Sequence, residues 1–218
     1  MSFDFSVVPS YAQILWTGVL WTILITVLAG AISVAFGIGI AVTSMYGSKI
    51  ASVPLRGVAF LFMGTPLLLQ LYLFYYGLSQ VGIMLPAFWT GVLGLGLHYA
   101  AYNADIFRAC LKGVDTGQTE AARSLGFGRG ATLRHFIIPQ ALLTALPQVG
   151  NNSIILLKDT AVLSVLGITE LVLSAQRAIS ETYRPFEFYF TAALLYYLVN
   201  LAMEYLLSIA ARKVEAIR

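Results

Sequence analysis

Charged side chains are scarce in this sequence. Aspartate, glutamate, lysine and arginine make up 11% of the 218 residues, whereas hydrophobic residues make up 59%. A soluble globular domain carries roughly 25% charged residues, and the mean hydropathy here is +0.82. A helix that spans a membrane needs about 20 predominantly apolar residues, so the chain holds material for several. The composition therefore excludes an ordinary soluble domain.

Several chemical signatures are also missing. Cys110 is the single cysteine, which excludes a disulfide within the chain and argues against a cysteine-rich metal site. The sequence has no G-x-x-x-x-G-K-[ST] phosphate loop, no H-E-x-x-H zinc helix and no G-x-S-x-G nucleophile elbow. Neither His98 nor His135 has a cysteine or carboxylate cluster at ligand spacing. We therefore expect neither an enzyme nor a chain that holds ATP or a metal itself.

The apolar stretches predict an all-α membrane protein with five transmembrane helices in a single domain over residues 1–218. The expected spans cover about residues 14–44, 58–80, 86–108, 136–157 and 188–209. The first span is long enough to tilt or to end in the membrane interface. Its glycines Gly30, Gly37 and Gly39 either serve close helix packing or are merely tolerated, and the sequence leaves both interpretations open.

Lysine and arginine decide the orientation, because cytoplasmic loops carry an excess of both. With five spans and the N-terminus outside, the outer side holds three basic residues, Lys158, Arg177 and Arg184. The inner side holds Lys49, Arg56, Arg108, Lys112, Arg123, Arg129, Arg134, Arg212, Lys213 and Arg218. We therefore expect the N-terminus outside and the C-terminus in the cytoplasm. The first residues show no basic n-region or cleavage signature, so the first span is expected to be retained.

The cytoplasmic loop at about residues 112–135 is polar and basic. Asp115 is expected to cap a short helix, and Gly126 sits where a left-handed C-terminal cap needs glycine. Ala121 and Ala122 offer a compact face that another protein could approach. From this chemistry alone, a plain re-entry loop whose arginines set the orientation is an equal alternative.

The same loop contains Glu120-Ala121-Ala122, then Gly126, and later an apolar-x-apolar-Pro that ends at Pro139. This pattern resembles the EAA loop of permease subunits of ABC-type importers, which docks on an ATPase. Further blocks in order are similar to the polar amino-acid (histidine, glutamine, arginine and opine) branch of that family. They are Gly64-Thr65-Pro66 followed by LLLQLYLFYYGL, Ala101-Tyr102 through Asp105 to Arg108, Gly150-Asn151, LLKDTAVLSVLGITEL and Tyr183 to Phe186. The resemblance covers nearly the whole chain.

The resemblance implies the type I ABC importer permease fold and a multi-pass protein of the bacterial inner (plasma) membrane. It implies that Glu120, Ala121, Ala122, Arg123 and Gly126 couple the chain to a separate ATPase. The expected partners are an ABC ATPase dimer that binds ATP and Mg, a second permease subunit, a periplasmic or extracellular solute-binding protein and membrane lipid. No nucleic acid is expected.

An outer segment, residues 169–187, alternates charged and apolar residues in a way that suggests an amphipathic helix on the membrane surface. By resemblance it would face the solute-binding protein, and a plain surface helix is the alternative. Asp105 and Arg108, three residues apart on one helix face, are expected to form an ion pair.

Polar side chains inside membrane spans usually face partner helices or a cavity. The candidates for the substrate path are Gln70, His98, Asn151, Asn152, Lys158 and Asp159. By sequence alone Lys158 marks the outer end of the fourth span, whereas the resemblance places LLKDTAVLSVLG along the path near the external gate. For His98, a hydrogen bond between helices is favoured over a contact with substrate.

Two departures from the family bear on the substrate. Members that carry cationic amino acids often have acidic residues at the places of Phe60 and Asn152, and both are neutral here. A cationic group in a low-dielectric cavity needs a carboxylate partner, so the substrate differs or a non-identical permease completes the site. The Gly150-Asn151-Asn152 form favours such a heteromeric pair. The sequence does not name the amino acid or opine.

The alternative function is a gradient-driven secondary amino-acid carrier. Such a carrier would more often contain internal repeats with matched broken helices, and no second copy of any block occurs here.

Overall fold

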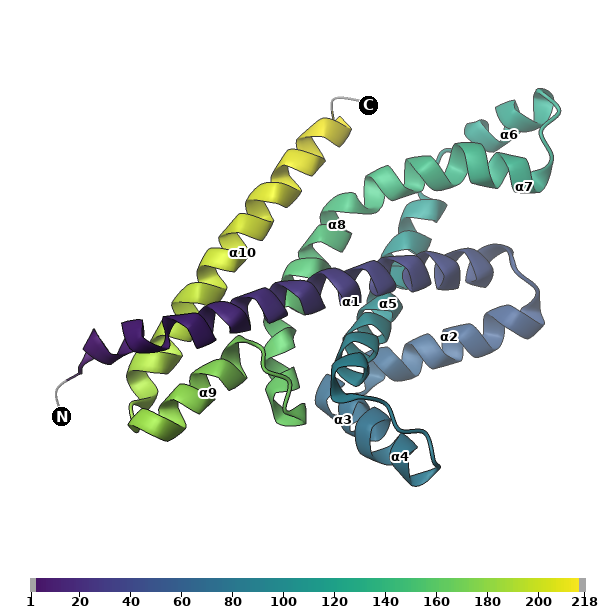
Figure 1. The fold of residues 1–218 in the computed structure, drawn as a ribbon. Coiled ribbons are helices and arrows are strands. Elements are labelled where there is room, and N and C mark those ends of the chain that lie inside the picture. Colours follow the sequence, from purple (N-terminus) through teal and green to yellow (C-terminus); the bar gives the residue numbers. More distant parts are fainter. Residues whose placement is uncertain (1–2, 216–218) are drawn as a thin grey trace.

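The computed structural model describes residues 3–215, with side chains through Arg212, and every regular element in this part of the chain is a helix. The helices are α1 Ala12–Tyr46, α2 Lys49–Gly64, α3 Leu67–Tyr72, α4 Leu78–Gln80, α5 Ala87–Lys112, α6 Thr116–Ser124, α7 Arg129–Thr132, α8 Ile138–Asp159, α9 Leu171–Thr182 and α10 Pro185–Glu215 (Figure 1). Short 3-10 helices cover Phe5–Tyr11 and Thr160–Leu166, and π-helical turns cover Leu73–Gly77 and Leu133–Ile137. The expected all-α class is confirmed.

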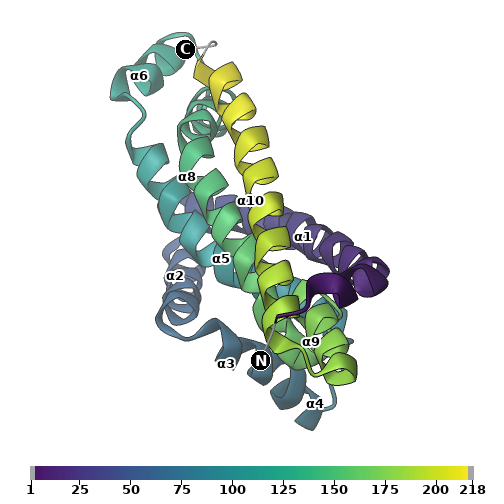
Figure 2. The same cartoon turned by 90° about the vertical axis from the view of Figure 1, so that its left-hand side faces the viewer.

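The long helices form two layers. In Figure 2, α5, α8 and α10 run side by side with α8 in the middle, and α1 crosses behind them. The loop with α6 and the C-terminal end of α10 lie at one end of the molecule, whereas α3, α4 and α9 lie at the other end. The polar loop is therefore held far from α9.

By length and apolar composition, two described helical stretches could each cross a membrane, Phe5–Tyr46 and Pro185–Arg212. The pair Lys49–Gly64 and Leu67–Gln80 would add a third crossing if its halves, bent by 113°, form one span. The helices α5 and α8 have 26 and 22 residues, which is long enough for a bilayer core of about 30 Å. Five crossings thus stay a prediction.

The expected span at 58–80 is not one straight helix. It begins inside α2 and breaks at Thr65, whose backbone is extended at φ −120° and ψ 145°. Pro66 causes the break, because proline disfavours a helical conformation in the residue before it and has no N–H for the helix ladder.

The most extensive helix–helix contact joins α1 to α5. A Cβ atom on Gly37 would lie 2.9 Å from Cβ of Asn103, and one on Gly96 would lie 2.6 Å from Cγ2 of Ile32. A Cβ on Gly30 or Gly39 would meet no atom within 4 Å. Close packing within the chain therefore explains Gly37, whereas Gly30 and Gly39 make no such contact with the described residues.

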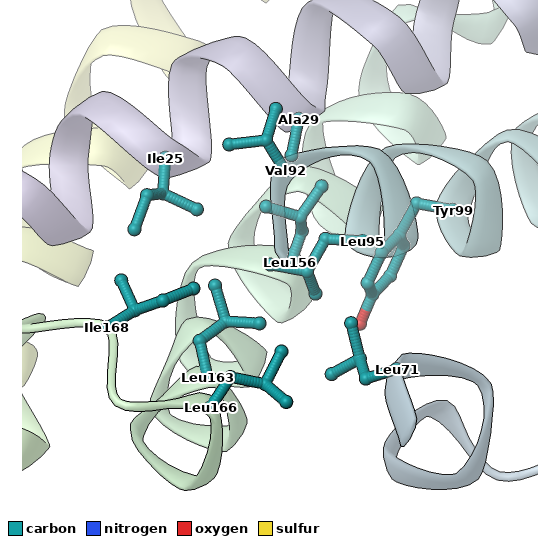
Figure 3. Close-up of a cluster of buried hydrophobic side chains, with 10 residues drawn as sticks. All are labelled: Ile25, Ala29, Leu71, Val92, Leu95, Tyr99, Leu156, Leu163, Leu166 and Ile168. Carbon is teal, nitrogen blue, oxygen red and sulfur yellow. The ribbon is translucent and has the colours of Figure 1, made fainter. Parts of the chain in front are cut away.

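Apolar side chains from α1, α3, α5, α8 and the segment after α8 meet in one cluster (Figure 3). Its members are Ile25, Ala29, Leu71, Val92, Leu95, Tyr99, Leu156, Leu163, Leu166 and Ile168. Because Leu71 is fully buried here, the cluster anchors α3 against α5. It also anchors the 3-10 segment Thr160–Leu166, which ends at Gly167 with φ +77°.

The outer segment forms α9, but this helix packs into the bundle. Leu171, Ala175 and Ala178 are fully buried against α1 and α10. Glu170 is also fully buried: its carboxylate caps α9 by accepting from the N–H of Val172, and its Oε2 accepts from the Tyr196 hydroxyl at 2.7 Å. Burial raises the pKa of Glu170, and the bonds to Val172 and Tyr196 act in the opposite direction. The expected helix exists, but one face lies inside the protein.

The crossing of α1 and α5 can be tested with two matched substitutions. Gly37→Val places two methyl groups where Asn103 already lies, so it should destabilise the protein by about 1–3 kcal/mol through overpacking. Thermal denaturation of the purified protein in detergent would show a lower melting temperature. Gly39→Val makes the same change in open space and should leave the melting temperature unchanged. An equal decrease in both variants would contradict the assignment.

Candidate functional site

The loop between α5 and α8 carries α6 as a separately capped helix. Asp115 Oδ1 accepts from the N–H of Gly117 at 2.6 Å and caps its first turn. At the other end Gly126 has φ +84°, a conformation that glycine adopts without steric cost. The N–H of Gly126 donates to the carbonyl of Arg123 at 2.9 Å, and that of Phe127 donates to Ala122 at 3.1 Å. These two hydrogen bonds together form the Schellman motif. Both predicted caps of α6 are therefore present.

The exposed side of α6 differs from the expected one. Glu120, Ala121 and Arg123 are exposed, whereas Ala122 is only 2% exposed. The expectation that Ala122 shares an open face with Ala121 is therefore wrong. Successive residues of an α-helix are rotated by about 100°. This rotation turns Ala122 toward the segment that leads from α6 back to α8. Leu125, at 76% exposure, is the large apolar side chain that a partner could cover.

The loop is joined directly to α8. Gln140 of α8 donates through Nε2 to Gln118 Oε1 of α6 at 3.2 Å, and the rings of Phe127 and Phe136 meet edge-to-face with centroids 5.0 Å apart. The π-helical turn Leu133–Ile137 runs without a break into α8. A displacement of α6 would therefore move the start of α8.

Between the loop and the end of α1 lies a hollow of about 500 Å³, lined among others by Tyr46, Thr119, Arg123 and Arg129. Two guanidinium groups thus border the space behind α6, consistent with the basic character of this loop.

The candidate path residues Gln70 and His98 bond to each other across two helices. Gln70 Nε2 donates to the carbonyls of Phe62 at 2.8 Å and Thr65 at 3.0 Å and to the Thr65 hydroxyl at 2.7 Å. Gln70 Oε1 lies 3.0 Å from His98 Nδ1. Because an amide oxygen only accepts, this network assigns the proton to His98 Nδ1. The favoured interpretation of His98 as a link between helices agrees with this geometry.

Asn152 also bonds inside the protein. Asn152 Nδ2 donates to Asn103 Oδ1 at 2.9 Å, and Asn103 Nδ2 donates to Ser33 Oγ at 3.1 Å. This chain of side chains ties α8 to α5 and α5 to α1. Further along α8, the Tyr99 hydroxyl donates to Asp159 Oδ2 at 2.6 Å.

Asn151 and Lys158 lie on a different side of α8, and both are exposed. They belong to one strip of exposed positions at helical spacing: Thr144, Gln148, Asn151, Ile155 and Lys158. Polar groups on a membrane helix rarely face lipid, so this strip suits a polar path or a neighbouring subunit. The structure thus divides the six candidates into four that are bonded internally and two that are open.

Glu204 is a candidate that the sequence reasoning missed. It lies on α10 and lines, together with Asn151 of α8, a groove of about 270 Å³. The sequence feature that could have identified it is that Glu204 is the single carboxylate within the last expected span, residues 188–209. Near the C-terminal end of α5, the ion pair expected from the sequence is confirmed: Arg108 Nη2 lies 2.9 Å from Asp105 Oδ1.

A protein family described as "Binding-protein-dependent transport system inner membrane component" matches residues 33–216. The chain belongs to this family. It is 34% identical over 195 residues to the octopine transport system permease protein OccM of Rhizobium radiobacter, covering 85% of this chain and 80% of that protein. It is 31% identical over 221 residues to the arginine transport system permease protein ArtQ of Bacillus subtilis (strain 168), covering 99% of each.

Another relative, the octopine transport system permease protein OccM of Rhizobium meliloti, is 40% identical over 156 residues; the match spans 67% of this chain and 64% of that protein. The fold is also that of a solved structure, the crystal structure of an amino acid ABC transporter with histidines. The TM-score is 0.89 at 40% identity, with 98% of this chain and 100% of that chain covered.

These matches confirm the resemblance to permease subunits of amino-acid ABC importers and the type I permease fold. A family of this kind supplies transport components of the membrane, and no relative or structure found supports the gradient-driven carrier.

In this permease Gln70 should be needed for the bend between α2 and α3. Gln70→Leu keeps the size but removes the Nε2 donor that bonds the carbonyls of Phe62 and Thr65, which should cost about 1–3 kcal/mol. The expected result is a lower melting temperature in detergent. The control Gln80→Leu changes an exposed glutamine at the end of α4 and should have no such effect. Equal stability of Gln70→Leu and the unmodified protein would contradict the role of this side chain.

Proposed function

We propose that this chain is the permease subunit of an ATP-driven importer that moves a polar amino acid or a related compound, such as an opine, across the bacterial inner (plasma) membrane. The observation that carries the proposal is α6: a short helix capped at both ends, with Glu120 and Ala121 exposed at the tip of a loop that is fastened to α8. The arginine and octopine permeases among its relatives support the substrate class.

The energy comes from a partner. Since the sequence lacks a phosphate loop, an ABC ATPase dimer binds ATP and Mg, and α6 docks on it through Glu120, Ala121, Arg123 and Gly126. When the ATPase subunits close, α6 moves with them, and the direct connection to α8 carries this displacement into the membrane. The Asn152–Asn103–Ser33 chain then passes it to α5 and α1.

The orientation follows from the basic residues. The chain crosses the membrane five times, with the N-terminus outside and the C-terminus in the cytoplasm. This places α6 and the end of α10 together on the inner side, in agreement with their position at one end of the molecule (Figure 2). A solute-binding protein delivers substrate at the opposite end, where α9 lies.

The translocation path lies between this chain and a second, non-identical permease. The exposed strip of α8 with Asn151 and Lys158 faces the path, since polar groups there would be costly against lipid. Phe60 and Asn152, both neutral, favour a pair in which the two permeases contribute different groups. Gln70, His98 and Asp159 contribute indirectly, because their hydrogen bonds hold in place the helices that line the path.

The coupling role of α6 can be tested by changing its C-cap. Gly126→Val forces a β-branched residue to φ +84°, a strain of about 1–3 kcal/mol, and should abolish ATP-driven uptake while the amount of protein in the membrane is unchanged. Glu120→Lys should do the same by reversing the charge that meets the ATPase. Gly128→Val is the control, because Gly128 has φ −67° and open space around it. Normal uptake by both variants would remove the assignment, and uptake that survives ATP depletion but collapses with an uncoupler would indicate a carrier.

Chemical labelling tests the orientation. Arg123→Cys should react with a membrane-impermeant maleimide only after the membrane is opened, whereas Arg177→Cys on α9 should react in intact cells. The native Cys110 is buried and should contribute little background. Labelling of Arg123→Cys from outside would contradict the proposed topology and the docking of an ATPase on α6.

A further inference from the structure

Between Phe188 and Ile209 of α10, Glu204 is the only charged residue in the sequence. A carboxylate at such a position is energetically costly in a membrane and usually faces a cavity, a pathway or a charged partner. The side chain of Glu204 is exposed at the surface of this chain. The residues around Glu204 therefore indicate which kind of group it binds.

Glu204 faces a groove between α8 and α10. Gly150 brings the two helices together at this point, since a Cβ there would lie 3.3 Å from Cδ2 of Leu207. The groove has a volume of about 270 Å³, and Asn151 and Ser208 line it beside Glu204. Because Asn151 belongs to the exposed polar strip of α8, the groove opens onto the proposed path.

Glu204 has a single hydrogen-bond partner among the described residues. Asn200 Nδ2 donates to Glu204 Oε1 at 2.7 Å, whereas Asn200 Oδ1 is buried and receives no hydrogen bond from any described residue. None of the ion pairs in the described part of the chain involves Glu204. The next basic residue along α10, Arg212, lies more than two helical turns away. The groove thus carries a carboxylate that has no cationic partner among the described residues.

We propose that this groove binds the cationic side-chain end, guanidinium or ammonium, of a transported amino acid, with Glu204 as its charge partner. Guanidinium and ammonium groups carry several N–H donors and no acceptor, so one of them would pair with Glu204 and with the side-chain oxygen of Asn151 on the same groove. The inference rests on the proposed function and narrows its substrate class. It also accounts for the neutral Phe60 and Asn152, because α10 supplies the carboxylate instead.

The test compares two ligands that differ in charge. L-citrulline has the shape of L-arginine with a neutral ureido group in place of the guanidinium. Binding of both radiolabelled amino acids is measured on the purified complex of permeases and ATPase, without the solute-binding protein. The complex should prefer arginine by about tenfold or more, the range of a charge-assisted hydrogen bond, and Glu204→Gln should remove this preference while citrulline binding stays.

A matched control is Glu181→Gln, which removes another exposed carboxylate outside the groove and should keep the preference. No arginine binding, equal binding of both ligands by the unmodified complex, or an unchanged preference in Glu204→Gln would overturn the proposal. Separation of the two permeases in Glu204→Gln during size-exclusion chromatography would also overturn it, because Glu204 would then pair with a cation of the partner subunit. ATP-driven uptake into proteoliposomes with the solute-binding protein present is measured separately, and its absence in the unmodified complex would count against the proposed function itself.

Discussion

The contact on which this structure depends is the crossing of α1 and α5. In lipid, apolar side chains gain little by meeting each other, so helices associate through close backbone approach and hydrogen bonds between side chains. Gly37 and Gly96 permit the approach, and Asn103 bonds at the same place to Ser33 of α1 and Asn152 of α8. Three long helices are thereby held at one buried amide, whose exposed fraction is 1%.

The bend at Thr65 and Pro66 follows the same constraint. A broken helix leaves backbone carbonyls without intrahelical partners, and such groups are tolerated at membrane depth only when other protein groups satisfy them. Gln70 satisfies the carbonyls of Phe62 and Thr65 and is itself held by His98 of α5. The break is thus a fixed part of the fold, and it lets α3 turn under α5 and place Leu71 in the core.

Polar residues in the membrane helices divide into two groups with different tasks. Those bonded inside the protein join α1, α3, α5 and α8 into one unit, so that a displacement of α6 reaches all of them through α8. Those on the outer faces, with Asn151 on α8 and Glu204 on α10, have few partners among the described residues. In the proposed function, the first group provides mechanical continuity between the helices, and the second provides the surface that recognises a polar solute.

The sequence by itself determined the features that depend on near neighbours along the chain. Asp115 and Gly126 predicted both caps of α6, because capping involves residues within one turn, and the ordered motifs identified the family. The tertiary structure decided which side each membrane residue faces. Gly37 packs and Gly39 does not, Ala122 is covered and Ala121 is open, and Asn152 bonds inward while Asn151 faces out. Neighbours in sequence differ in this way because helix crossings select faces, and the crossings depend on contacts between segments far apart in the chain.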